Sequence, residues 1–382
     1  MEIKRLIESA VKESVTEYPV ITILGPRQSG KTTLARALFT DKPYRTLEDP
    51  ETRRYADHDP RNFLADFPDG AVLDEVQRVP DLLSYIQGIV DDKKRNGLFV
   101  LTGSSNILLM QSVTQSLAGR CAIHTLLPFC LKESCGIVPA DSHLAAILSG
   151  GYPRLLAGGM KREPFFANYV NTYVERDVRQ LLNIKDTRLF STFIQLLAGR
   201  IGTILDVTSI SNDCGISTKT VTEWLSILHT SYICFLLPPW YENRGKRLVK
   251  SPKIYFYDTG LACALAGIDT TDQLNRDPLR GRLFENLIVV EAMKRAYNAG
   301  KRPRLYFYRD SNGVEVDLVE QKGRTLVPTE IKSSATFHPD FCKNLQKFAD
   351  RYSDACANPT VAYAGDESFT FKGVSVVPFH QL

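Results

Sequence analysis

The sequence lacks the features of a zinc-binding, a secreted and a membrane-spanning protein. None of its eight cysteines forms a C-x-x-C pair, so no zinc site is indicated. The opening stretch, MEIKRLIESA, mixes charges at helical spacing and does not resemble a secretory signal peptide. No uncharged apolar run approaches the ~18 residues that a membrane span needs. We therefore expect a reduced, cytoplasmic protein that does not enter a membrane.

A large excess of charge of one sign is also missing. The formal net charge is +4, which permits a nucleic-acid partner but does not argue for one. The chain has no internal repeat and no low-complexity tract. Its 382 residues are 43% hydrophobic and 24% charged, as in ordinary globular proteins. This length predicts two or three domains, each large enough for its own core.

The most informative motif is GPRQSGKT, which lies between the apolar run PVITIL and the amphipathic stretch TLARALF. Its spacing fits GxxxxGK[ST], in which glycines let backbone N–H groups face phosphate oxygens. Lys31 would reach the β- and γ-phosphates of ATP, and Thr32 would hold Mg²⁺. A strand is predicted over 20–24 and a helix over 31–39, with its N-terminus facing the phosphates. The predicted nucleotide-binding residues are Gly25, Pro26, Arg27, Gln28, Ser29, Gly30, Lys31, Thr32 and Thr33.

The first third alternates apolar runs with helical patterns, which predicts a parallel sheet flanked by helices. The runs are VITIL, YRTL, AVLD and LFVLTG. Ligands of such sheets bind at the carboxyl ends of the strands. There, Asp74 would anchor the Mg²⁺ shell and Glu75 would polarise the attacking water.

Further candidates for contact with the γ-phosphate follow the last of these runs. Ser104, Ser105 or Asn106 could sense the phosphate or position water, although Ser and Asn are equally good helix caps. Arg120, in SLAGR, could neutralise charge that develops at the γ-phosphate, its own or a neighbouring subunit's. Arg154 and Arg176 are weaker candidates for the same role.

These motifs together carry a resemblance. GPRQSGKTTLAR, LDEVQRVPDLL, LTGSSN and SLAGR, followed by GGYP and YVERDV, resemble the bacterial and archaeal AAA-type ATPases with a C-terminal DUF4143 region. The similarity spans essentially the whole chain. It implies an ATPase of the additional-strand class, related to AAA+ proteins, which often work as ring oligomers. It supports the roles of Lys31, Thr32, Asp74 and Glu75, and it leaves the arginines ambiguous.

The middle of the chain predicts a helical lid and a winged helix. Helical spacing covers HLAAILSGGYPRLLAGG and PFFANYVNTYVERDVRQLLNI, which we expect to cover the nucleotide. A short helix over 209–213, a turn at 214–215 and a second helix after Ser217 predict a helix-turn-helix, and a hairpin follows. It would either contact DNA or dock a protein. The predicted DNA-contacting residues are Lys219, Arg244, Lys246, Arg247 and Lys250.

The C-terminal region carries a second set of phosphate-handling residues. VEVDLV and LVPTEIK predict two strands joined by a turn, and GRLFENLIVVEAMKRA predicts a helix that carries Glu285. One Asp followed by E-x-K on the next strand looks like the PD-(D/E)xK nuclease core. Asp317 and Glu330 would hold Mg²⁺, with Glu285 supporting the metal or its shell, and Lys332 would orient or deprotonate the attacking water. An active nuclease, a nuclease fold that only binds nucleic acid, and chance charge alternation all remain open.

The expected fold is therefore α/β: a P-loop ATPase sheet over 1–137, a helical lid over 138–197, a winged helix over 198–270 and a nuclease-like domain over 271–382. The predicted function is ATP-dependent DNA processing by a homo-oligomer that uses ATP and Mg²⁺, with Mg²⁺-dependent cleavage as an added activity. The alternative is an ATP-gated switch whose winged helix docks a protein partner and whose nuclease-like domain is inactive.

Overall fold

The computed structural model describes residues 3–104, 116–139, 142–178, 187–243, 245 and 250–382. The chain divides into two compact units. The first contains residues 1–129, 230–232 and 295–302, and the second contains residues 130–229, 233–294 and 303–382.

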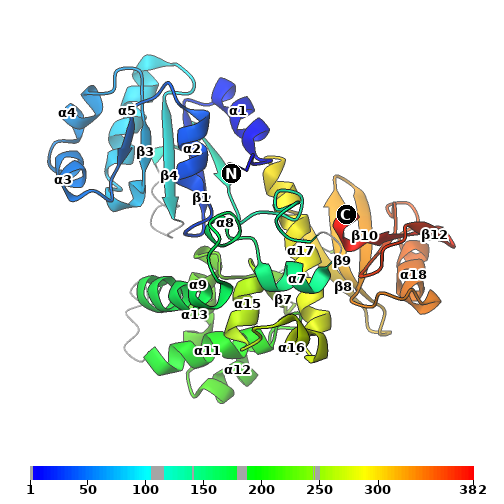
Figure 1. The fold of residues 1–382 in the computed structure, drawn as a ribbon. Coiled ribbons are helices and arrows are strands. Elements are labelled where there is room, and N and C mark those ends of the chain that lie inside the picture. Colours follow the sequence, from blue (N-terminus) through cyan, green and yellow to red (C-terminus); the bar gives the residue numbers. More distant parts are fainter. Residues whose placement is uncertain (1–2, 105–115, 140–141, 179–186, 244, 246–249) are drawn as a thin grey trace. The chain divides into compact units, whose positions relative to one another are not determined.

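The first unit is a parallel sheet between two layers of helices, with strand order β2-β3-β4-β1-β5 (Figure 1). Its side chains alternate between the two faces, as β1 shows: Val20 and Leu24 pack with α3, α4 and α5, whereas Ile21 and Ile23 pack with α1 and α2. The strands are β1 Val20–Gly25, β2 Tyr44–Thr46, β3 Val72–Asp74, β4 Phe99–Ser104 and β5 Cys121–Thr125. The helices are α1 Glu8–Glu17, α2 Lys31–Leu38, α3 Pro50–His58, α4 Pro60–Ala65 and α5 Leu82–Lys93.

The four predicted strands are confirmed, and β5 is an addition. β5 pairs in parallel with β1. It escaped prediction because its polarity is reversed: His124 is buried against Ser14, whereas Ile123 is 41% exposed. An alternating pattern with a polar residue inside does not look like a half-buried strand.

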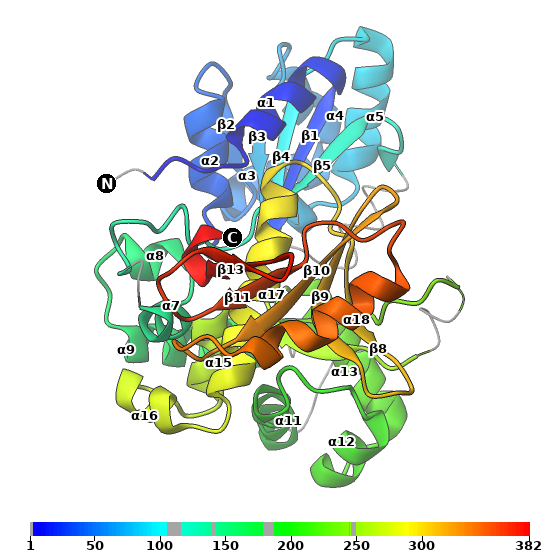
Figure 2. The same ribbon diagram turned by 90° about the vertical axis from the view of Figure 1, so that its right-hand side faces the viewer.

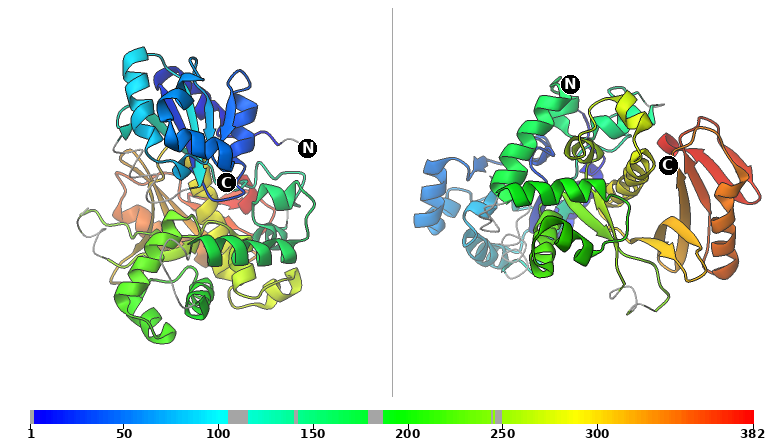
Figure 3. Two further views of the ribbon diagram at one scale, coloured as in Figure 1. Left: turned by 90° about the vertical axis from the view of Figure 1, so that its left-hand side faces the viewer. Right: turned by 90° about the horizontal axis from the view of Figure 1, so that it is seen from below.

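The second unit begins with helices, which gather in one group (green in Figure 3). Asp206 caps α12, and Gly215 ends it with a φ of +65°, the left-handed geometry in which glycine is favoured. Ser217 accepts a hydrogen bond from the Thr220 amide and caps α13, as predicted. The helices are α7 His143–Ser149, α8 Pro153–Leu156, α9 Arg162–Tyr169 with a π-helical continuation Val170–Val178, α11 Thr187–Gly199, α12 Val207–Cys214 and α13 Thr218–Thr230.

A two-stranded antiparallel ribbon, β6 Cys234–Leu237 and β7 Lys253–Phe256, follows the helices. The predicted hairpin is therefore present, but Arg244, Lys246 and Arg247 lie outside the described residues. The ribbon is followed by α15 Thr259–Leu265, α16 Thr271–Arg276 and α17 Arg280–Asn298.

A six-stranded mixed sheet, in the order β12-β13-β11-β10-β9-β8, ends the chain. α17 lies along one face of this sheet and α18 Lys343–Arg351 along the other (Figure 2). On the α18 side, Leu345 and Phe348 pack against Val316 and Val319. The strands are β8 Leu305–Arg309, β9 Glu315–Lys322, β10 Thr325–Lys332, β11 Thr360–Tyr363, β12 Phe369–Phe371 and β13 Val374–Pro378.

Candidate functional sites

The phosphate loop connects β1 to α2 and depends on two glycines. Gly25 has a φ of +154°, and a Cβ there would lie 2.1 Å from the Leu126 carbonyl oxygen. Gly30 has a φ of +93° directly before α2. Arg5 supports the loop from outside, since its guanidinium donates to the Ser29 and Leu127 carbonyls at 2.8 and 2.7 Å. This support was not predicted, because Arg5 is distant in sequence.

Lys31 is buried, and no carboxylate among the described residues is in hydrogen-bonding contact with it. Its ammonium donates to the carbonyl oxygens of Gly25, at 3.1 Å, and Pro26, at 2.8 Å. Burial lowers the pKa of Lys31 to about 8, although Glu75 and Asp74 act in the opposite direction. The buried Ser29 hydroxyl oxygen has no hydrogen-bond partner among the described residues. A charge and a polar group left unsatisfied in the loop are what a bound phosphate would satisfy.

Asp74 ends β3 and meets Thr32 as the motif predicts. The Thr32 hydroxyl donates to both carboxylate oxygens, at 3.1 and 3.0 Å. Tyr44 donates to Oδ2 at 2.7 Å, and Thr102 donates to Oδ1, so the carboxylate is held in one orientation. Oxygen ligands from Thr32 and Asp74 suit Mg²⁺, and the residues therefore fit that ion. Tyr44 and Thr102 were not predicted; Tyr44 opens β2 and Thr102 lies within β4, the two neighbours of β3 in the sheet.

Glu75 lies beside Asp74 in a left-handed backbone conformation with a φ of +58°. A non-glycine residue in this region is strained, and such strain gathers at functional sites. The Gln77 amide donates to Glu75 Oε2 and, at 2.9 Å, to the Ser104 hydroxyl. The buried Gln77 Oε1 has no hydrogen-bond partner among the described residues. Gln77 thus holds the Glu75 carboxylate, which is predicted to polarise water, and its own Oε1 is an acceptor beside that carboxylate.

Arg120 does not lie at the phosphate loop of its own chain. It immediately precedes β5, and its carbonyl accepts from the amide of Val20, the first residue of β1, whereas the loop follows the last residue of that strand. Its guanidinium forms a two-point ion pair with Asp91, with 2.8 Å between Nη2 and Oδ2. Asn106 lies outside the described residues, as does the side chain of Arg176. Arg154 is exposed on α8.

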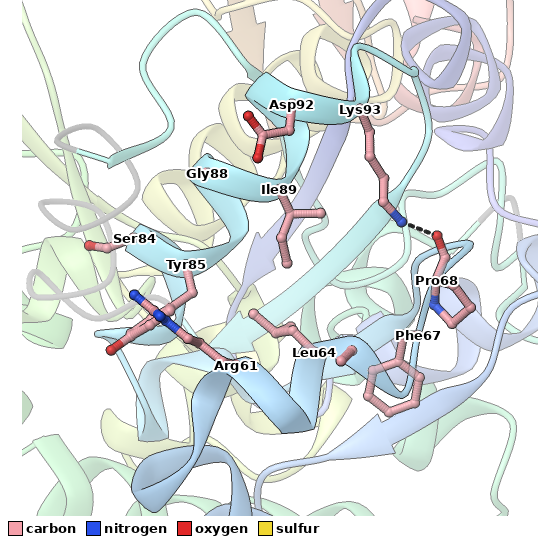
Figure 4. Close-up of a pocket in the computed structure, with 11 residues that line it drawn as sticks. Arg61, Leu64, Phe67, Pro68, Ser84, Tyr85, Gly88, Ile89, Asp92 and Lys93 are labelled. Carbon is pink, nitrogen blue, oxygen red and sulfur yellow. Dashed lines mark hydrogen bonds between the residues drawn. The ribbon is translucent and has the colours of Figure 1, made fainter.

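A separate cavity of about 700 Å³ lies between α4 and α5 (Figure 4). Leu64, Phe67 and Ile89 line its floor, and Arg61, Tyr85 and Asp92 stand around it. Gly25 to Thr33, the predicted nucleotide-binding residues that the structure describes, do not line this cavity.

In the second unit, β9, β10 and α17 bring the predicted nuclease-like residues together. Lys332 lies 2.6 Å from Glu330 Oε1 and 3.9 Å from Asp317 Oδ2. Asp317 Oδ2 also accepts from the Ile331 amide at 2.8 Å. Burial disfavours the ammonium, but Asp317 and Glu330 outweigh it and raise the pKa of Lys332. Lys332 is therefore charged at neutral pH and suited to contact a phosphate.

Glu285 faces this group from α17, with partners that the sequence analysis missed. Lys253 lies 3.0 Å from Glu285 Oε1, and the Tyr255 hydroxyl donates to the same oxygen at 2.5 Å. Lys253 also lies 2.8 Å from Glu315 Oε1. Burial and the charge of Asp317 raise the pKa of Glu285 despite these two donors. A lysine in the otherwise apolar run KIYF was the only sign of this arrangement in the sequence.

The carboxylates do not form a metal site as they stand. Within the described part of the chain, no three His, Cys, Asp or Glu side chains are grouped so that they could hold a metal ion. Glu330 Oε2 is buried without a hydrogen-bond partner among the described residues, but the other carboxylates face ammonium groups. The metal-binding roles of Glu285, Asp317 and Glu330 remain predictions.

Two of the predicted DNA-contacting residues lie within the described residues, one on the helix pair formed by α12 and α13 and one beyond it. Lys219 is exposed on α13 and lies 3.9 Å from Glu223, one turn along the helix. Lys250 is exposed after the hairpin tip. No helix in the described segments is long and apolar enough to span a membrane.

Three family profiles match successive parts of the chain. An AAA domain matches residues 17–135, a domain of unknown function (DUF8612) matches residues 142–272, and a second one (DUF4143) matches residues 280–382. An uncharacterised protein of Mycobacterium tuberculosis is 29% identical over 390 residues, with 99% of this chain and 84% of the relative covered. An uncharacterised protein of Haemophilus influenzae is 24% identical over 298 residues, with 74% and 70% covered.

Among solved structures, the Walker-type ATPase PABY2304 of Pyrococcus abyssi is similar, with a TM-score of 0.44 and 17% identity. The similarity covers 68% of this chain and 94% of that one. The AAA match spans the parallel sheet, the phosphate loop and Asp74, and the DUF4143 match spans α17 and the mixed sheet. The chain therefore carries an AAA domain over residues 17–135 and a DUF4143 domain over residues 280–382.

Proposed function

We propose that this ATPase processes DNA, with ATP hydrolysis in the first unit coupled to DNA binding by the second. The observation that carries the proposal is the convergence of Asp317, Glu330 and Lys332 on adjacent strands, with Glu285 facing them. A charged lysine among carboxylates at a sheet surface is suited to a sugar–phosphate backbone. The chain thus has two sites for phosphate chemistry, of which one hydrolyses ATP.

In the ATPase reaction, residues of the chain bind and orient the phosphates of ATP and polarise the attacking water. Loop amides and Lys31 would hold the β- and γ-phosphates, and Glu75, held by Gln77, would take the proton of the attacking water. Mg²⁺ bound by Thr32 and Asp74 would neutralise charge on the phosphates.

Arg120 would act only between subunits, because it stands at the opposite end of β1 from the loop. We therefore propose a homo-oligomer, a ring in the simplest case, in which each subunit supplies this arginine to its neighbour. Cytoplasmic location and Mg²⁺ use belong to the same proposal.

The test is the ATPase rate with and without single-stranded, duplex and branched DNA, at low and moderate salt. We expect DNA to raise the rate and moderate salt to reduce the effect, because phosphate contacts release counterions. Lys332→Met should lose the stimulation and keep the basal rate. Lys322→Met is the matched control, since Lys322 is an exposed lysine at the end of β9. A rate that no DNA changes would remove the proposal.

One observation favours a second function, in which the helix pair docks a protein. On the exposed side of α13, Lys219 is paired with Glu223, and an acidic residue there would repel a DNA backbone. ATP would then gate a protein-binding surface, and the DUF4143 domain would be a scaffold. A partner whose capture requires Lys31, together with no DNA binding at low salt, would favour this function over DNA processing.

A further inference from the structure

Lys253 is placed where nothing in its own strand requires a lysine. It opens β7, whose other residues are the apolar and buried Ile254, Tyr255 and Phe256, and it is itself only 4% exposed. Burial of an ammonium is strongly unfavourable unless carboxylates pair with it. Its Nζ atom meets two of them, Glu285 at 3.0 Å and Glu315 at 2.8 Å.

The two carboxylates come from different elements. Glu285 belongs to α17 and Glu315 to β9, two residues before Asp317 on the same strand. The Tyr255 hydroxyl reaches the Glu285 oxygen that Lys253 contacts, so this oxygen already has two donors. On the other side of the cluster, Lys332 contacts Glu330 and lies near Asp317.

The cluster therefore has four carboxylates and two ammonium groups, with Lys253 between α17 and β9. A divalent cation needs carboxylate oxygens that are free to coordinate, and it would be repelled by an ammonium a few ångströms away. Lys253 supplies the compensating charge that such an ion would otherwise bring.

We propose that the Lys253 ammonium is the resident cation of this carboxylate cluster and excludes a divalent metal ion from it. Because the ammonium is tethered to β7, the hairpin strand decides whether Glu285, Glu315 and Asp317 are available to a metal. The inference concerns the cluster on which the proposed function rests. Its test uses neither DNA nor ATP, so this inference and the proposed function can fail independently of each other.

The test is binding of Mn²⁺ to nucleotide-free protein, measured by calorimetry and by electron paramagnetic resonance. All proteins carry Asp74→Asn, which removes the carboxylate ligand at the phosphate loop. We expect Lys253→Met to bind one Mn²⁺ at least about tenfold more tightly than the parent, a difference of about 1.4 kcal/mol. Adding Asp317→Asn should abolish this gain. Lys253→Arg is the matched control, which keeps the positive charge and should bind as weakly as the parent.

Equal affinity of parent and Lys253→Met for a Mn²⁺ ion that Asp317→Asn removes would overturn the proposal. The proposal can also be tested if Lys253→Met does not fold. If Lys253→Met is unfolded alone, Mn²⁺ should restore its structure in circular dichroism, since the metal replaces the missing charge. A variant that stays unfolded at saturating Mn²⁺ would also count against the proposal. Lys253→Gln, which keeps a donor without the charge, should behave as Lys253→Met does.

Discussion

At the scale of single residues, the phosphate loop combines buried charge with incomplete partners. Among the described residues, Lys31 donates to carbonyl oxygens alone and the buried Ser29 hydroxyl oxygen has no hydrogen-bond partner. A binding site built for an anion is electrostatically unfavourable while empty, because its positive charge is desolvated without compensation. Replacing a charged residue of this site should therefore stabilise the nucleotide-free protein while abolishing its activity.

Lys31→Met should abolish ATP hydrolysis and stabilise the nucleotide-free protein by about 1–3 kcal/mol. Methionine fills similar space without a charge to desolvate. Thermal and urea unfolding without nucleotide would measure the gain. With saturating ATP the order should reverse, because only the wild type is stabilised by the ligand. A nucleotide-free variant less stable than the wild type would contradict this account of Lys31.

The buried charge of Lys31 also makes the stability of the nucleotide-free protein depend on pH. The unfolded chain keeps the Lys31 proton up to its ordinary pKa of 10.5, whereas the folded protein loses it at about 8. Between these values the unfolded state binds more protons, so the contribution of Lys31 to stability rises with pH. The difference in unfolding free energy between Lys31→Met and wild type should therefore shrink from pH 8 to pH 10. Taking this difference cancels the titration of other groups.

Gln77 should be a positioning residue for Glu75. Gln77→Leu removes the amide that holds the carboxylate near Ser104, so kcat should fall about 10- to 100-fold while KM for ATP changes little. Ser104→Ala, which removes the weaker 3.3 Å contact to Glu75, should have the smaller effect. Steady-state ATPase kinetics would decide. A Gln77→Leu enzyme with wild-type kcat would show that Glu75 needs no such support.

Among the helices and strands, those with a regular local pattern were predicted from the sequence, whereas β5 depends on tertiary packing. The predicted strands 20–24 and 44–47 correspond to β1 and β2, and the helix predicted after Ser217 is α13, whose buried residues are Val221, Trp224, Leu225 and Leu228. β5 was missed because His124 points inward and Ile123 outward. A strand at a sheet edge takes its polarity from the helix packed on it, here Ser14 of α1, and no local pattern records that.

Two glycines in the first unit should respond to alanine with opposite signs. Gly25→Ala places a methyl group against the Leu126 carbonyl and should destabilise the protein by about 2–4 kcal/mol, with loss of nucleotide binding. Gly88→Ala, inside α5 where a Cβ would meet no described atom outside the helix's own backbone within 4 Å, should stabilise it by up to about 1 kcal/mol. Urea unfolding and a fluorescent-nucleotide titration test both. A Gly25→Ala protein as stable as wild type would mean that the backbone there adapts.

At the scale of the whole molecule, the question is whether one subunit completes the site of another. Arg120 pairs with Asp91 and stands away from the loop of its own chain. If it acts across an interface, Arg120→Ala and Glu75→Gln proteins should each be inactive, and mixing them should restore part of the activity. Mixed oligomers then contain interfaces with both an intact glutamate and an intact arginine. ATPase assays of titrated mixtures, with sedimentation to establish assembly, would measure this. Assembled mixtures with no activity would exclude Arg120 from the neighbouring site.

The ATPase domain was predictable from two short motifs. GPRQSGKT and the Asp74–Glu75 pair are contiguous residues whose chemistry depends on local backbone shape and on strand ends, and both can be recognised without distant contacts. The sequence also placed Glu285, Asp317, Glu330 and Lys332 on the elements where they lie.

The surroundings of these groups depend on how the helices and strands pack. Lys253 and Tyr255 reach Glu285 because β7 packs beside α17, and Gln77 reaches Ser104 because β3 and β4 are neighbours in the sheet. Charge compensation acts through distances of a few ångströms between residues far apart in the chain. A motif can therefore name the carboxylates of a site, but only the packing of the elements shows which cation they hold.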